Sequence, residues 1–167
     1  MAVMNTPLSF FGVDEVIYKG QKVCGAYQPP VPLPDNCFKE VSPNVLNIFA
    51  LYKHFKMPEE SRIPFTNCKT PLLMIAGSDD QISPSVEQAM LAKELMLANG
   101  KTNFEIAIYD GLGHLIDLPF SPPTTKEKHA VFPKHILIQM GGEDLVKHGQ
   151  AQEKIWAKLL HFFLMHL

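Results

Sequence analysis

The sequence predicts an α/β fold in which a mostly parallel sheet is flanked by helices. The apolar run at residues 71–77 ends at a glycine and is followed by two acidic residues, which is typical of a strand buried on both faces. A helical segment and a second apolar strand, at residues 104–109, come next. Because a strand, a helix and a strand in this order form a crossover unit, we expect the two strands to lie parallel.

The elements before residue 71 are shorter. Residues 1–5 predict a strand, and residues 16–23 predict a small hairpin. The proline cluster at residues 29–34 predicts a loop, because proline removes a backbone donor. The pair Ser42-Pro43 can cap a helix. The apolar stripe of that helix would consist of Val45, Ile48, Phe49, Tyr52 and Phe55.

Two longer helices complete the prediction. Ser83 and Pro84 supply an N-cap and a first-turn proline for a helix that runs to about Ala98 and stops at Asn99-Gly100. Its expected apolar face consists of Val86, Met90, Leu91, Leu95 and Ala98. A closing helix is expected at residues 149–167. Its apolar stripe consists of Ile155, Trp156, Leu159, Leu160 and Phe163, and we expect it to pack in the core rather than to bind a cofactor.

Composition narrows the range of partners. The chain has 167 residues, of which 46% are hydrophobic and 19% charged, as in one globular domain. Its net charge of −2 argues against binding of nucleic acid or an anionic membrane. The apolar stretch at residues 156–167 is interrupted by charged and histidine side chains and is too short for a membrane span.

The cysteines and the C-terminus bear on the compartment. Cys24, Cys37 and Cys68 are an odd number without the CxxC spacing, and no secretory leader precedes them, so a reducing, intracellular setting is expected. The last three residues do not match the Ser-Lys-Leu peroxisomal signal. We therefore favour the cytoplasm, with the peroxisome and the mitochondrion as alternatives.

Asp80 and His114 are the candidate catalytic residues. Each follows a predicted parallel strand at its carboxyl end, where open α/β sheets place their ligands and catalytic groups. Gly111 and Gly113 allow the sharp turn that would bring His114 over the sheet edge towards Asp80. A carboxylate that accepts the Nδ1 hydrogen fixes the imidazole tautomer and leaves Nε2 to act as the base.

Each candidate residue also has a structural explanation. Asp80 could be part of a solvated turn or a helix cap, and His114 could be a hydrogen-bonded loop histidine.

A catalytic triad of the α/β-hydrolase kind needs a third member, a nucleophile on a G-x-S-x-G elbow upstream of both residues. None of the serines has this setting, and neither does Cys24; Ser78 is too close to the acid to be a convincing nucleophile. The remaining histidines show no metal-ligand spacing, so no metal is expected.

The sequence resembles the C-terminal domain shared by the type I acyl-CoA thioesterases and bile acid-CoA:amino acid N-acyltransferase. The resembling segments are Tyr18-Lys19-Gly20, Ile75-Ala76-Gly77-Ser78-Asp79-Asp80, Ile108 to His114, Asp117-Leu118-Pro119-Phe120, Gly141-Gly142-Glu143, Ala151-Gln152 through Trp156 to Phe162-Phe163, and His166-Leu167. The resemblance implies that residues 1–167 form a single partial α/β-hydrolase domain, the C-terminal half of that fold, without its nucleophile.

The resemblance also implies a chemistry. Asp80 would be the triad acid and His114 the base, and the reaction would be hydrolysis of fatty acyl-CoA through an acyl-enzyme, with coenzyme A as part of the substrate and no separate cofactor. Acyl transfer to glycine or taurine, a noncatalytic acyl-CoA-binding remnant, and a small-ester hydrolase of the dienelactone hydrolase-like group are the alternatives. We expect a monomer. We also expect little or no turnover by this chain alone, because the oxyanion-hole donors are missing as well as the nucleophile.

Overall fold

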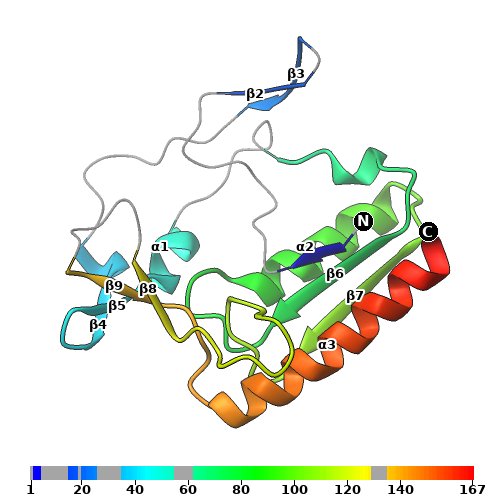
Figure 1. The fold of residues 1–167 in the computed structure, drawn as a ribbon. Coiled ribbons are helices and arrows are strands. Elements are labelled where there is room, and N and C mark those ends of the chain that lie inside the picture. The colour runs from blue at the N-terminus through cyan, green and yellow to red at the C-terminus, as the bar shows by residue number, and fades with distance from the viewer. Residues whose placement is uncertain (1, 5–14, 19, 26–34, 55–61, 129–134) are drawn as a thin grey trace.

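A three-stranded sheet forms the centre of the computed structural model (Figure 1). The structure describes residues 2–4, 15–18, 20–25, 35–54, 62–128 and 135–167. The central sheet consists of β1 (Ala2–Met4), β6 (Leu72–Gly77) and β7 (Phe104–Tyr109), in the order β1-β6-β7, and both pairings are parallel. All of β6 is buried, because it lies between the other two strands and is covered on both faces. The predicted strands at residues 71–77 and 104–109 are thus confirmed.

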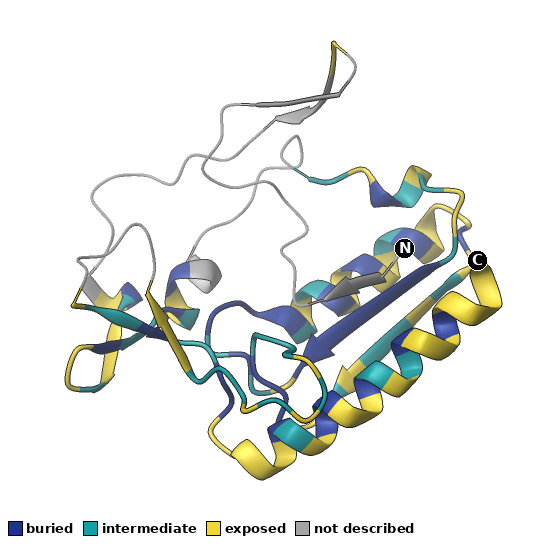
Figure 2. Ribbon diagram, in the orientation of Figure 1, coloured by how far each residue is buried: buried dark blue, intermediate teal, exposed yellow. Residues whose placement is uncertain are grey.

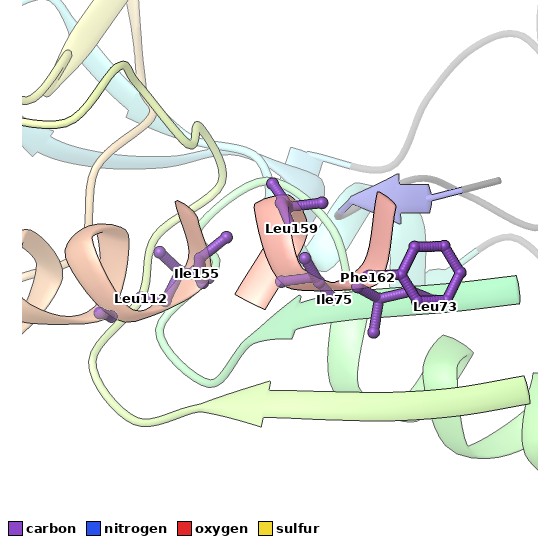
Figure 3. Close-up of a cluster of buried hydrophobic side chains, with 7 residues drawn as sticks. Leu73, Ile75, Leu112, Ile155, Leu159 and Phe162 are labelled. Carbon is purple, nitrogen blue, oxygen red and sulfur yellow. The ribbon is translucent and has the colours of Figure 1, made fainter. Parts of the chain in front are cut away.

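Two helices cover the faces of this sheet. One is α3 (Leu145–His166), which packs on the face that presents Leu73 and Ile75. The other is α2 (Ser85–Ala98), which packs on the face that presents Leu72 and Met74. Figure 3 shows the first of these contacts, with Leu73, Ile75, Leu112, Ile155, Leu159 and Phe162 in one apolar cluster. The alternation along β6 therefore divides the core into two layers.

The predicted apolar face of α2 is confirmed only in part, since Leu95 packs against the core but Ala98 is exposed. The buried positions are Ser85, Ala89, Ala92 and Met96, whereas Met90 and Leu91 are exposed. The inner face combines the small side chains of Ala89 and Ala92 with the large side chain of Met96, which packs in the cluster of Leu72 and Met74. The start is also shifted: Pro84 is the N-cap, and no side-chain hydrogen bond caps the helix. The predicted stop is confirmed by Gly100, which has a φ of 69°.

The closing helix is longer than predicted. It begins at Leu145 instead of residue 149, because the carboxylate of Asp144 accepts hydrogen bonds from two main-chain NH groups of the first turn. Ile155 and Leu159 are buried as predicted, but Leu160 is exposed and Phe162 occupies the core in place of Phe163. Figure 2 shows the buried side of the helix facing β7 and its exposed side facing outwards.

A second sheet lies beside the first (Figure 1). Its strands, in the order β4-β5-β9-β8, are β4 (Lys39–Ser42), β5 (Val45–Asn47), β9 (Leu137–Gln139) and β8 (Lys126–Lys128). The helix predicted after Ser42-Pro43 therefore begins later than expected, and the first part of the predicted stretch is a strand. A turn with Asn44 at a φ of 61° joins β4 to β5, and the helix α1 (Phe49–His54) begins only after that hairpin. Phe55, the last residue of the predicted stripe, lies outside the described residues.

The α/β class is confirmed, whereas a mostly parallel arrangement holds only for the central sheet. In the second sheet β5 pairs with β9 in parallel, but β4–β5 and β8–β9 are antiparallel. The predicted hairpin is present as β2 (Glu15–Tyr18) and β3 (Gln21–Gly25), which are also antiparallel. Within the described ranges, no helix has both the length and the hydropathy that crossing a bilayer requires.

Candidate active site

Asp80 and His114 meet at the carboxyl edge of the central sheet. Asp80 lies in the loop after β6 and His114 in the loop after β7, and these strands are parallel neighbours. His114 Nδ1 is 2.9 Å from Asp80 Oδ2 and 3.1 Å from Oδ1. The Asp80 side chain is 2% exposed and that of His114 is 21% exposed. The structure thus brings the two predicted residues together, with the acid buried and the imidazole partly open to solvent.

Four further hydrogen-bond donors surround the Asp80 carboxylate. Oδ1 accepts hydrogen bonds from the main-chain NH groups of Ile82, at 2.8 Å, and Ser83, at 3.0 Å. Oδ2 accepts from the Ser83 hydroxyl at 3.1 Å and from the Ser85 hydroxyl. This set was missed at the sequence level, where Ser83 is expected to cap α2. The turn explanation for Asp80 is therefore correct in part, since the carboxylate both closes a local turn and contacts His114.

These donors determine the charge of Asp80. Burial raises the pKa of the carboxyl group, but the hydrogen bond and the charge of His114, together with the bonds from Ser85 and Ser83, lower it by more. The net effect is a pKa below the ordinary aspartate value. A buried carboxylate that stays ionised can orient an imidazole and stabilise it when it becomes protonated.

The loops that carry the two residues approach each other at glycines. A Cβ atom on Gly77 would come closer than 3.0 Å to the Leu112 carbonyl group, and one on Gly113 would come equally close to the backbone of Gly141 and Gly142. The close approach is also a hydrogen-bonded one: Asp79 N donates to Leu112 O at 3.0 Å. The absence of side chains at these glycines therefore allows three loops, after β6, β7 and β9, to pack against one another at the site.

The third loop holds the His114 loop in place. His114 N donates to Met140 O at 2.8 Å, just before the Gly141-Gly142 pair. Gly113 N donates to His148 Nδ1 at 2.9 Å. Asp79 links the first loop to the third, because its Oδ2 accepts the Glu143 NH at 2.5 Å. The sequence contained one indication of this loop, the Gly-Gly pair, whereas no metal-ligand spacing distinguished His148 from the other histidines.

A cavity of about 300 Å³ adjoins Asp80. Its lining includes Phe49, Gly77, Ser78, Asp80, Ser85 and Val86. The volume is at the lower end of the range for small-molecule pockets. The cavity therefore places space for part of a ligand next to the carboxylate that contacts His114.

No nucleophile elbow is present in the 167 residues, since no two glycines are four positions apart. Ser78 is engaged elsewhere: its hydroxyl accepts the Gly111 NH at 2.9 Å and donates to Asp110 at 3.4 Å. Cys37 is buried in an apolar cluster, and Cys68 precedes β6, at the opposite end of the strand from Asp80. The side chain of Cys24 lies outside the described part of the chain. Across the described ranges, no group of three or more potential ligands could hold a metal ion.

We expect acid to destabilise the protein in two stages. Burial lowers the pKa of His148 in the folded protein. The contribution of the neutral ring to the free energy of unfolding is therefore complete above pH 6.5, the ordinary pKa, and is lost as the pH falls from 6.5 towards the lowered folded-state pKa. The pKa of Asp80 is lowered too, so its contribution is lost only as the pH falls below about 3.8. Urea unfolding between pH 8 and pH 3 measures both stages. A His161→Asn variant, altered at an exposed position, should keep the first stage, and a flat stability between pH 7 and pH 5 in the unmodified chain would contradict it.

Comparison with known proteins identifies the family. Residues 1–167 match the family model described as "BAAT / Acyl-CoA thioester hydrolase C terminal". Mouse acyl-coenzyme A thioesterase 5 is 35% identical over 158 residues, which cover 93% of this chain and 35% of that protein. Human bile acid-CoA:amino acid N-acyltransferase is 30% identical over 161 residues, 94% of this chain and 35% of that protein. Mouse peroxisomal succinyl-coenzyme A thioesterase is 33% identical over 107 residues, 64% of this chain and 25% of that protein.

The chain thus spans about a quarter to a third of the length of these relatives. The matched segment contains both predicted site residues and the three loops that pack around them. With the family model matching every residue, the chain belongs to the BAAT/acyl-CoA thioester hydrolase C-terminal family.

Proposed function

We propose that residues 1–167 are a single partial α/β-hydrolase domain, the C-terminal half of that fold, which supplies the acid and the base for hydrolysis of fatty acyl-CoA. The observation that carries the proposal is the 2.9 Å contact between His114 Nδ1 and Asp80 Oδ2 at the carboxyl edge of two parallel strands. Membership of a family described by acyl-CoA thioester hydrolysis supports this substrate class. Asp80 is the acid and His114 the general base in this proposal.

The chemistry follows from the protonation states of the pair. The ionised Asp80 accepts the Nδ1 hydrogen, so the imidazole accepts a further proton at Nε2. In the first step His114 takes the proton of a serine or cysteine outside these 167 residues as that nucleophile attacks the thioester carbonyl. The same proton then goes to the departing coenzyme A thiolate, and an acyl-enzyme remains. In the second step His114 removes a proton from water as the water attacks the acyl-enzyme. It then gives this proton to the departing serine or cysteine, and the fatty acid is released.

Acyl transfer is the second candidate. It shares the acyl-enzyme and differs only in the acceptor, since the amine of glycine or taurine replaces water. Its support is the likeness to the human N-acyltransferase, which covers as much of this chain as the likeness to thioesterase 5 does. In both versions coenzyme A enters as part of the substrate, and no separate cofactor or nucleic acid is involved. The protein acts as a monomer in this proposal. We propose an intracellular location with the cytoplasm favoured, and the peroxisomal relative keeps that organelle as an alternative.

A chimaera tests this proposal. Residues 1–167 would replace the matching region of mouse acyl-coenzyme A thioesterase 5, and a thiol reagent would measure coenzyme A released from palmitoyl-CoA. We expect release by the chimaera and none by the 167-residue chain alone. Faster cleavage of a short p-nitrophenyl ester than of palmitoyl-CoA would favour a small-ester hydrolase instead. If a folded chimaera bound palmitoyl-CoA in calorimetry without cleaving it, the catalytic proposal would be wrong and the binding alternative correct.

A further inference from the structure

Three residues of α3 bind the main chain of the loop that carries His114. His148 Nδ1 accepts the Gly113 NH at 2.9 Å. Gln152 Oε1 accepts the Asp117 NH at 2.6 Å, and Trp156 Nε1 donates to the Asp117 carbonyl at 2.7 Å. These residues are spaced four apart, so they lie on one face of the helix. The helix thus holds the main chain on both sides of His114.

Two polar side chains on this face of the helix are buried, so their hydrogen bonds to the loop are needed to offset the loss of water. His148 is 0% exposed and Gln152 is 3% exposed, so both polar groups have left water. Apolar side chains at Ile155 and Leu159, on the neighbouring face, already attach the helix to the sheet. Packing alone therefore does not explain polar side chains at these buried positions, because burying polar groups is unfavourable unless they form hydrogen bonds.

His148 bears the clearest sign of this arrangement. Because Nδ1 accepts the Gly113 NH, the neutral ring carries its proton on Nε2. Burial lowers the pKa of His148, and the carboxylates of Asp117 and Asp79 and the Gln152 side chain oppose this without reversing it. Although Gln152 lies close enough to favour the protonated ring, no group of the described residues completes a hydrogen bond to Nε2. The neutral ring therefore keeps Nδ1 as the acceptor that Gly113 uses.

We propose that His148, Gln152 and Trp156 are positioning residues that fix the His114 loop so that Nδ1 faces Asp80. Their hydrogen bonds go to the main chain of Gly113 and Asp117, and they act through it on the acid and the base. The far end of the loop is fixed in the same way, since the Asp117 carboxylate accepts hydrogen bonds from Thr124 N at 2.7 Å and Thr124 Oγ1 at 2.9 Å. The catalytic meaning of this clamp rests on the proposed function, whereas the geometry that it enforces does not.

The test is NMR of the ¹⁵N-labelled 167-residue chain, which requires neither nucleophile nor substrate. We expect a slowly exchanging His114 Nδ1 proton in the wild type. His148→Leu removes the acceptor, so this signal should be lost through fast exchange with water. In His148→Asn the amide oxygen replaces Nδ1 as the acceptor, and the signal should be retained. His161→Leu changes an exposed histidine of the same helix and should leave the signal as in the wild type.

Trp156→Phe keeps the test decisive if His148→Leu does not fold. This change removes one donor and keeps an aromatic ring, and we expect several-fold faster exchange of the His114 Nδ1 proton. If folded His148→Leu or Trp156→Phe proteins were less stable but kept the wild-type exchange rate of the His114 Nδ1 proton, the residues would be merely structural and the inference overturned. Loss of catalysis in the chimaera would not affect these NMR results, so the two proposals fail separately.

Discussion

Replacing His114 by alanine is expected to lower the rate of coenzyme A release by about 10⁶-fold in the chimaera, if it acts as the general base. Without the imidazole, nothing accepts the proton of the nucleophile or returns it to the leaving thiolate. The change should leave the fold intact, since the His114 main-chain NH, which bonds Met140 O, is retained. The amount of coenzyme A released after fixed reaction times measures the effect, and circular dichroism checks that the variant is folded.

Asp80→Asn is expected to lower the rate as well, but by less than His114→Ala. The amide retains an oxygen for the Ile82 and Ser83 NH groups but presents NH₂ hydrogens that would compete with the His114 Nδ1 hydrogen. The imidazole would then adopt the wrong tautomer, which costs about 10⁴-fold in kcat in a triad. Asp110→Asn is the matched control, because that carboxylate is exposed and pairs with Lys147 at 3.0 Å. Equal losses from the two aspartate variants would argue against a triad role for Asp80.

The candidate site was predictable because its signals are local. A wholly apolar strand followed by an acidic pair, and a glycine-flanked histidine after the next strand, place Asp80 and His114 at one sheet edge as soon as the strands are parallel. The carboxyl ends of β6 and β7 then fix the meeting point. The precise angle between the loops does not enter this argument, so sequence alone was sufficient.

The parts that failed depend on contacts between distant segments. Val45 belongs to a strand rather than a helix because β5 pairs in parallel with β9, whose residues come much later in the chain. The inner face of α2 is set by its packing against the sheet, where Ala92 and Met96 join the cluster of Leu72 and Met74, and this leaves Met90 and Leu91 exposed. The clamp from α3 could not be anticipated either, because a histidine, a glutamine and a tryptophan at helical spacing have no characteristic partner until the His114 loop lies beside them.

Gly113→Ala is expected to have the largest effect on folding, a loss of about 3 kcal/mol in the free energy of unfolding. The added Cβ would come closer than 3.0 Å to three backbone atoms of the Gly141-Gly142 pair. A flexible side chain could rotate away from such a contact, whereas backbone atoms can move only with their loop. Urea unfolding measures the change, and Gly149→Ala is the control. That glycine lies in α3 with open space around it, so alanine there should stabilise the helix by about 0.5–1 kcal/mol.

The structural response of the protein to Gly113→Ala also tests how the three loops pack together. If the β9–α3 loop moves to make room, the hydrogen bonds from Gly113 to His148 and from His114 to Met140 must lengthen together, because all four groups lie at the same contact. The variant should therefore lose the slowly exchanging His114 Nδ1 proton as well as stability. A destabilised protein that kept this proton would mean that the clamp from α3 holds His114 even when the glycine contact is broken. Unchanged stability would mean that the loops are not tightly packed at Gly113.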